Sequence, residues 1–317
     1  MLSSLTRNGT GYIHRFVRVF LTILTLFLIG LWSGGSVEAR GFDRKHFKSP
    51  EEAAASFFAA LKNKDAKELS AIFGREGEDL IHSGDPVADE ETRQTAVKLF
   101  EEGYRIVNDG SRRAILEIGK ENWPFPIPVT AVKGEWQFNT KDGIEEILAR
   151  RIGRNEIGAI RACQAYADAQ YEYAAQTQSD GVPEYAQKLF SDPGKKDGLY
   201  WEGGDSPIGI FMAKAWQQGY RKGSPEKPAP YRGYYFKIMK AQGKHAPGGA
   251  YDYMVKGRMI GGFALVAYPA KYGASGIMTF IVNHAGVVYQ KDLGSKTGSI
   301  AAKMSLFDPD GSWQKVQ

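Results

Sequence analysis

A histidine and an aspartate lie seven positions apart in one loop rich in glycine and proline. They are His245 and Asp252, in the stretch QGKHAPGGAYDY. A histidine beside a carboxylate can act as a general base, because the carboxylate orients the imidazole and stabilises its protonated form. Loops of this composition also serve as ordinary connections between strands. The loop is therefore a candidate site, with a plain connection as the alternative.

Aromatic side chains form the second candidate feature. Tyr200 and Trp201 lie between glycines in DGLYWEGGD. Exposed aromatics bind sugars or proteins, because they offer a large rigid surface with a polar tip. Buried aromatics fill the core, which is their commoner role. We expect most of the tyrosines that follow to be core residues, and we take as the candidate binding loop Tyr200, Trp201, His245 and Asp252.

Three motifs with catalytic counterparts have simpler structural interpretations. Cys163, the single cysteine, could be a nucleophile beside a histidine, but a cysteine among small residues is most often buried and inert. His284 in the turn NHAG is expected to be solvated. In GGDSPIG, Ser206 lacks the Gly-x-Ser-x-Gly setting of a hydrolase nucleophile, so Asp205 or Ser206 is expected to cap a helix over residues 207–218.

The motifs for phosphates and metals are incomplete. GSKTG, residues 294–298, lacks the Gly-Lys order of a phosphate-binding loop. DPDGSW, residues 308–313, has the composition of a turn and lacks the closing glutamate of a calcium loop. The five histidines are scattered, with no pair at the spacing that metal sites on helices use. We therefore predict no catalytic residues, no metal site and no cofactor.

The first 39 residues have the three parts of a secretory signal. A start with arginines is followed by the apolar run VFLTILTLFLIGLW and then by small residues up to Ala39. The run is short for a membrane span. We predict cleavage after Ala39 and a periplasmic or otherwise exported protein. The alternative is an uncleaved inner-membrane signal anchor, in which case membrane contact is limited to this segment.

Charge and cysteine content narrow the class of the exported part. The chain carries a net charge of +5, and because the segment 1–39 holds three arginines and one glutamate, the remainder carries +3. There is no block of lysine and arginine of the kind that binds nucleic acid, so we expect no nucleic-acid partner. One cysteine allows no intrachain disulfide, so the exported part must be held together by its core.

Residues 40–151 are expected to form a small α+β domain. SPEEAAASFFAALK places Ser49 as N-cap and Pro50 at the first helical position, with an apolar stripe at helical spacing. Further helices are expected over residues 67–73 and 89–102. Two runs with alternating polarity, RAILEIG and GEWQFN, flank the proline-rich WPFPIPV and predict strands. This opening resembles the start of NTF2-like domains.

Residues 152–317 are expected to form a second domain, a helix on a sheet. A helical run starts at Asp142, is expected to be interrupted at Gly153, and resumes over residues 154–176. Along it Ile157, Cys163 and Tyr171 share one predicted inward face with other residues at steps of three or four. GYYFKIM, MIGGFALVAYPA and GIMTFIVNHAGVVYQKDL predict an antiparallel β-meander whose last hairpin turns at residues 283–286.

The order of these features resembles the head domain of type IV pilins and pseudopilins. NEIGAIRACQAYADAQYEY, GYYFKI and FALVAYPAKYGASGIMTFIVNHAGVVY carry the resemblance, over residues 155–290. It implies a long helix packed on an antiparallel β-meander. A pilin continues this helix into an apolar segment at its mature N-terminus, and that segment is missing from the corresponding place here. We therefore expect no polymerisation into a pilus.

The mature chain also resembles an uncharacterised bacterial envelope family, domain-of-unknown-function family 2950, through DGLYW, QGKHAPGGAYDYMV and YGASGIMTFIVN. The resemblance implies export and a role in the envelope, and no activity. We expect a non-enzymatic module that binds an envelope protein or a cell-wall component. The alternatives are an accessory of a pilus system, and an envelope enzyme or small-ligand binder with its site around Trp201, His245 and Asp252.

Overall fold

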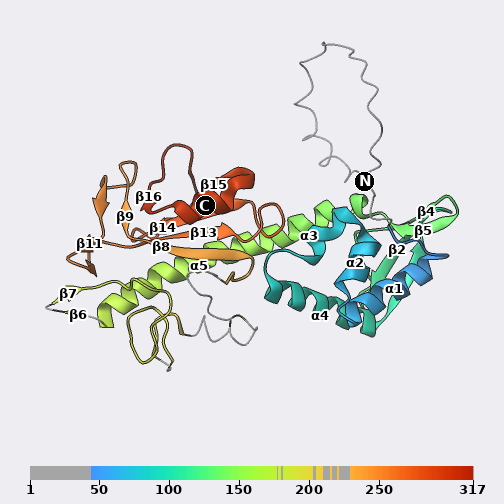
Figure 1. The fold of residues 1–317 in the computed structure, drawn as a ribbon, viewed down its shortest axis with the longest axis horizontal. Helices are drawn as coiled ribbons and strands as arrows, with labels where there is room; N and C mark the ends of the chain where they lie inside the picture. The colour runs from blue at the N-terminus through green and yellow to red at the C-terminus, as the bar shows by residue number, and fades with distance from the viewer. Residues whose placement is uncertain are drawn as a thin grey trace, which may run out of the picture. The chain divides into compact units, whose positions relative to one another are not determined.

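The structure is a computed structural model that describes residues 44–316, except 177, 180, 203–204, 210–214, 216–219 and 221–228 (Figure 1). For residues 178–179 only the backbone is described. The predicted signal segment 1–39 and most of the predicted helix 207–218 lie outside the described residues. Within the described part, no helix combines the length and apolar character needed to cross a membrane.

Four helices open the described chain, and side-chain caps explain where three of them begin. Ser49 caps the first helix by accepting from the backbone N–H of Glu52, and Asp65 and Asp85 do the same for the second and fourth helices. Pro50 and Pro86 take the first helical positions, as proline favours. The helices are α1 Pro50–Lys62, α2 Ala66–Phe73, α3 Glu78–Ile81 and α4 Pro86–Glu102, with a 3₁₀ turn Arg75–Gly77 before α3.

An antiparallel sheet packs against these helices. Its strand order is β1-β2-β4-β5, and β3 pairs with the other end of β2. The strands are β1 Tyr104–Asn108, β2 Arg113–Ile118, β3 Trp123–Pro124, β4 Val129–Val132 and β5 Glu135–Phe138. A ring cluster centred on Phe57, with Phe73, Phe100 and Phe138 at centroid distances of 5.1–5.5 Å, joins helices to sheet.

A 33-residue helix, α5 Ile144–Gln176, follows a 3₁₀ turn, Thr140–Asp142. The predicted interruption at Gly153 is wrong, because the helix continues through that residue. The predicted inward face is also partly wrong, since Ile157 is 53% exposed and Tyr171 is 48% exposed. The buried face instead includes small residues and polar ones, among them Ala159, Cys163 and Gln170.

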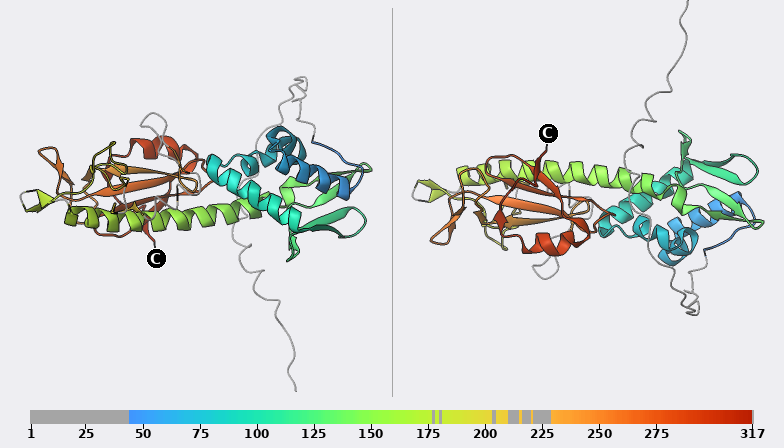
Figure 2. Two further views of the ribbon diagram at one scale, coloured as in Figure 1. Left: turned by 90° about the horizontal axis from the view of Figure 1, so that it is seen from below. Right: turned by 90° about the horizontal axis from the view of Figure 1, so that it is seen from above.

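The C-terminal sheet lies against α5 (Figures 1 and 2). Its order is β17-β15-β14-β13-β8, with every neighbouring pair antiparallel. The central strands β13 and β14 are almost wholly buried, which explains why their sequences are apolar on both faces. The hairpin between β14 and β15 turns where predicted, with the N–H of Gly286 donating to the carbonyl of Asn283 at 2.8 Å. The strands are β8 Tyr234–Met239, β13 Ala264–Pro269, β14 Met278–Asn283, β15 Tyr289–Asp292 and β17 Gln314–Lys315.

Short elements complete the described chain. Strands β9, β10 and β16 form a three-stranded sheet in the order β10-β9-β16, while β11 pairs with β12 and β6 pairs with β7. Their bounds are β6 Gln178–Ser179, β7 Val182–Pro183, β9 Ala241–Gln242, β10 Tyr251–Asp252, β11 Met254–Val255, β12 Arg258–Met259 and β16 Leu306–Phe307, with a 3₁₀ turn Gly294–Lys296 and helix α7 Thr297–Lys303 before β16.

The fold class is α+β, as predicted, with helices and antiparallel sheets in separate layers. Two hydrophobic clusters form the interior of the part that the structure describes. One joins α1, α2 and α4 to the N-terminal sheet, and the other joins α5 to the C-terminal sheet. The predicted boundary between residues 151 and 152 lies inside α5, so one continuous helix contributes to both halves.

Candidate functional site

His245 pairs with a carboxylate, which is Asp308 rather than Asp252. The His245 backbone N–H donates to Asp308 Oδ1 at 2.8 Å, and its ring Nδ1 lies 3.0 Å from Asp308 Oδ2. Both side chains are partly exposed, at 42% and 33%. Within the described part of the chain, no serine, threonine or cysteine side chain hydrogen-bonds this ring. The pair therefore has the orienting half of a triad and lacks a nucleophile.

Asp252 has a local role. Its Oδ1 accepts from the N–H of Met254 at 2.7 Å, a turn formed by the side chain just after β10. Asp252 is exposed, and its backbone pairs with Ala241 of β9, which pairs in turn with Leu306 of β16. The small three-stranded sheet thus brings the segments of His245, Asp252 and Asp308 together. Each aspartate, however, accepts a hydrogen bond from a different backbone N–H, Asp252 from Met254 and Asp308 from His245.

Trp201 is a buried anchor. Its side chain is 6% exposed, and its Nε1 donates to Asp205 Oδ1 at 2.7 Å. The Lys196 ammonium lies 5.0 Å from the ring centroid and bonds the other Asp205 oxygen at 2.5 Å. The ring edge meets Tyr173 of α5 at 6.4 Å. The neighbouring Tyr200 is half-buried, with its ring 6.1 Å from that of Phe190.

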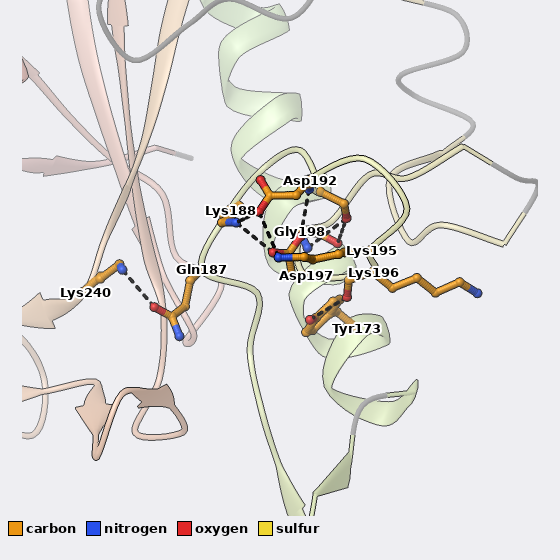
Figure 3. Close-up of polar contacts among 10 residues, drawn as sticks. Tyr173, Gln187, Lys188, Asp192, Lys195, Lys196, Asp197, Gly198 and Lys240 are labelled. Carbon is orange, nitrogen blue, oxygen red and sulfur yellow. Dashed lines mark hydrogen bonds and ion pairs between the residues drawn. The ribbon is translucent and has the colours of Figure 1, made fainter.

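A network of lysines and aspartates holds the loop before Tyr200 (Figure 3). Lys188 Nζ donates to Asp192 Oδ2 at 2.7 Å and to Asp197 Oδ2 at 2.8 Å. The hydroxyl of Tyr173 donates to the carbonyl of Lys196 at 3.0 Å and so fastens the loop to α5. The ion pairs are 35–44% exposed, so they fix the path of the loop more than they stabilise the fold.

Two of the motifs set aside as structural have buried side chains. Cys163 is fully buried in the interface of α5 with the sheet, and burial raises its pKa to about 12. A thiol in this state is not a nucleophile. Ser206 is also buried, while Asp205 of the same motif binds Trp201 and Lys196 rather than a catalytic base. In the part of the chain that the structure describes, no three His, Cys, Asp or Glu side chains are grouped to hold a metal ion.

The prediction that His284 is solvated is wrong. Its Nδ1 is buried without a hydrogen-bond partner among the described residues, and burial lowers the pKa of the imidazole. The ring packs edge-on against Tyr253 and Phe263, at centroid distances of 5.6 and 6.2 Å. Gly262 allows this approach, because a Cβ at that position would lie 2.6 Å from Nδ1. The turn therefore folds its histidine back onto the core.

Tyrosines lie around this histidine and Phe263. Tyr171 and Tyr185 meet Phe263 at 5.4 and 4.9 Å, and the Tyr251 hydroxyl lies 3.4 Å from His284 Nε2. The Tyr171 hydroxyl donates to the backbone carbonyl of His284. We call this surface the tyrosine face, defined by Tyr171, Tyr185, Tyr251 and His284.

The tyrosine face is open to solvent and has aliphatic neighbours. Tyr171 and Tyr251 are 48% and 38% exposed. Val182 and Val255, at 39% and 44%, lie in the adjacent strands β7 and β11. The N–H of Tyr185 donates to the carbonyl of Met259 at 2.8 Å, which joins the segment of β7 to the β11–β12 hairpin. Figures 1 and 2 show these strands gathered near the C-terminal end of α5.

Tyr251 belongs to the tyrosines that the sequence predicts to be mostly core residues, and Tyr171 is predicted to lie on the inward face of its helix. Tyr171, Tyr185 and His284 lie on three separate elements, and their proximity depends on how α5 crosses the sheet. The feature of the sequence that could have indicated this surface is its high tyrosine content, since an exposed tyrosine offers a partner both a ring and a hydroxyl.

The comparisons with known proteins assign a family and no activity. A family model described as "Protein of unknown function (DUF2950)" matches residues 44–316. No curated protein and no solved structure matches the chain. The likeness to pilin heads therefore stays a prediction from the sequence.

Proposed function

The chain belongs to the DUF2950 family, and for this member we propose an exported, non-enzymatic protein of the cell envelope that binds another protein through its tyrosine face. The export part of the proposal is motivated by the signal pattern of residues 1–39. The binding part is motivated by the exposure of aromatic and aliphatic side chains at one place on the C-terminal half.

The observation that carries the proposal is the construction of the tyrosine face. Tyr171 and Tyr251 present exposed rings that are fixed from behind, because Tyr171 rests on Phe263 and Tyr251 on Tyr253, both fully buried. Rigid aromatic side chains lose little conformational entropy when a partner covers them. A surface of this kind is suited to anchoring a partner.

The aliphatic surroundings favour a protein partner over a glycan. Val182 and Val255 are exposed apolar side chains close in sequence to Tyr185 and Tyr251, and valine offers a sugar neither a ring to stack on nor a hydrogen bond. Protein interfaces combine an aromatic and aliphatic centre with a polar rim. The ion pair of Arg258 in β12 with Glu184, the residue after β7, has a distance of 2.9 Å and would belong to such a rim.

An enzymatic function around Trp201, His245 and Asp252 is the alternative, and the local geometry gives it less support. Trp201 is engaged by Asp205, and Asp252 accepts from its own turn. His245 with Asp308 is the pair on which such an activity would depend. Replacing His245 by alanine would abolish an enzymatic activity and would leave binding at the tyrosine face unchanged.

Site-specific photo-cross-linking in the native envelope tests the proposal. A photoreactive amino acid is placed at Tyr251, at Val255 and, as a control, at Tyr104, an exposed tyrosine of β1. We expect one protein adduct of the same mass from the first two positions and none from the third. Equal adducts from all three positions, or attachment to cell-wall glycan alone, would contradict a protein-binding tyrosine face.

A further inference from the structure

Helix α4 leaves unfilled space beneath it. Of its 17 residues, Phe100 alone is fully buried. A cavity of about 460 Å³ lies on one side of the helix and a second of about 380 Å³ on the other. Thr92 and Ala96 of α4 line both cavities, and their short side chains explain why the space is not filled.

The larger cavity has apolar walls from several elements. Phe57 comes from α1, Leu69 from α2, Leu80 from α3 and Ile147 from α5, and Phe125 contributes from the sheet side. A volume of 460 Å³ lies within the range of about 300–1,000 Å³ that is usual for small-molecule sites. Apolar walls with few polar groups are the usual lining of such sites.

One wall carries a buried guanidinium. Arg151 is 7% exposed, and it donates from Nη1 to the carbonyl of Asp79 at 2.5 Å and from Nη2 to that of Leu80 at 2.8 Å. These bonds use two of the five N–H groups of an arginine. They also cap the carbonyl end of α3, so the position of the guanidinium is fixed. The guanidinium is also part of the cavity lining, so its positive charge lies at the wall that a ligand would contact.

The other charges of the lining largely cancel. Lys64 and Arg93 both bond Glu90, at 2.8 and 2.7 Å. Asp89 accepts from the backbone N–H of Ser83 at 3.0 Å, and burial raises the pKa of its carboxyl. With three cationic and two acidic side chains, the lining carries a net charge of +1 when all five are ionised. Arg151 is thus the cation best placed to meet an anion inside the cavity.

We propose that this cavity binds a small anionic amphiphile, a medium-chain carboxylic acid, with its chain among the apolar walls and its carboxylate directed at Arg151. A neutral hydrocarbon would displace water from the wall at Arg151 and offer its buried positive charge no negative partner. A cationic amphiphile would add a second positive charge beside Arg151. The site is separate from the tyrosine face and does not depend on it.

Isothermal titration calorimetry of the purified chain with three ligands of equal chain length tests the charge of the ligand. The ligands are dodecanoate, dodecanol and dodecyltrimethylammonium. We expect dodecanoate to bind at least about tenfold more tightly than either of the other two ligands. One well-formed hydrogen bond to a charged group is enough to produce a tenfold difference in the dissociation constant. Equal affinity for dodecanoate and dodecanol would overturn the role given to Arg151.

Two substitutions test the position of the ligand. Ala96→Phe fills the cavity and should weaken dodecanoate binding by at least about tenfold. Lys98→Phe is the matched control, because it adds the same side chain to an exposed position of α4 and should change nothing. Asp89→Asn removes one of the two acidic side chains of the lining and should strengthen dodecanoate binding. Thermal unfolding of each variant verifies that it is folded, and unchanged affinity in folded Ala96→Phe would overturn the site.

An anionic amphiphile could be a free acid or an anionic lipid of a bilayer, whose charge is a phosphodiester, so a vesicle assay separates the two sources. Co-sedimentation is measured with vesicles of phosphatidylglycerol, with and without dodecanoate. For a site that takes a free acid, we expect calorimetric binding of dodecanoate and no co-sedimentation. Co-sedimentation that Ala96→Phe does not alter, together with no binding of free dodecanoate, would assign the attraction to the membrane surface and overturn the proposal.

Discussion

The side chain of Asp85 accepts a hydrogen bond from the backbone N–H of Gly233 at 2.7 Å, across 148 positions of sequence. The carboxylate is fully buried. Its other oxygen accepts from the N–H groups of Val87 and Ala88 and so caps α4. The hydroxyl of Tyr220 donates at 3.1 Å to Asp85 Oδ2, the oxygen that also accepts from Gly233. One aspartate therefore starts a helix of the N-terminal half and fixes the segment that enters β8.

Asp85→Ala should destabilise the protein by about 2–4 kcal/mol, since it removes a helix cap and leaves the buried N–H of Gly233 without an acceptor. Asp65→Ala is the matched control. Asp65 caps α2 from an exposed position, so its loss should cost only about 1 kcal/mol. Urea denaturation of both variants measures the difference. Equal costs would mean that the bond to Gly233 adds nothing.

Two glycines around the start of α5 should respond to alanine in opposite directions. A Cβ at Gly143 would lie 2.2 Å from the carbonyl oxygen of Pro126, a backbone atom that cannot turn aside. Gly153 is helical, and apart from its chain neighbours and the backbone of its own helix no atom lies within 4 Å of the place where its Cβ would be. Gly143→Ala should therefore lower the free energy of unfolding by about 1–3 kcal/mol.

Gly153→Ala should raise the free energy of unfolding by about 0.5–1 kcal/mol, because alanine restricts the unfolded chain and favours the helix. Thermal or urea denaturation of the two variants under the same conditions supplies the comparison. A destabilising Gly153→Ala would mean that the helix needs flexibility at this residue, as the sequence alone suggested.

Local features of the fold could be predicted from the sequence because they depend on neighbouring residues. Ser49 with Pro50 marks the start of α1, and the turn at residues 283–286 joins two strands where expected. The inward face of α5 could not be predicted as well, because the polarity of its side chains does not determine which of them are buried. Ile157 is exposed although it is apolar, while Gln170 is buried because it bonds Tyr166 and the backbone of Ala186.

The contacts of the candidate site residues also depend on segments that are distant in the sequence. His245 was recognised, but its carboxylate lies 63 positions away in Asp308, within a motif dismissed as a turn. Nothing in the local sequence marks that pairing, since the two segments meet only through the parallel pairing of β9 with β16. His284 was misjudged because residues next to a turn are usually solvated, whereas Gly262 opens room for its ring at the core.

The lowered pKa of His284 predicts loss of stability at acidic pH. Burial lowers the pKa of the imidazole in the folded protein, and its ring faces Tyr253, Phe263 and the Tyr251 hydroxyl. The unfolded chain then binds the proton more readily than the folded one. The stabilising contribution is complete above the ordinary pKa near 6.5 and is lost as the pH falls through the lowered value.

Nuclear magnetic resonance titration of the ring protons of His284 should therefore give a midpoint below 6.5, the ordinary pKa of an imidazole. In urea denaturation between pH 7 and pH 5, replacing His284 by glutamine should reduce the loss of stability. A His284 midpoint at or above 6.5 would show that the ring is solvated after all.

Cys163 should be chemically silent in the folded protein. It is fully buried, and burial raises its pKa from about 9 to about 12, so the reactive thiolate is both rare and inaccessible at neutral pH. Labelling by a maleimide at pH 8 should be at least about a hundredfold slower in buffer than in urea, because it requires opening of the interface between α5 and the sheet.

The raised pKa of Cys163 also predicts how the stability of the protein depends on alkaline pH. The buried thiol stabilises the fold fully below its unfolded pKa, and this contribution declines as the pH rises from about 9 toward 12. Cys163→Ala should abolish that part of the alkaline decline, and rapid labelling in buffer would place the cysteine on a surface instead.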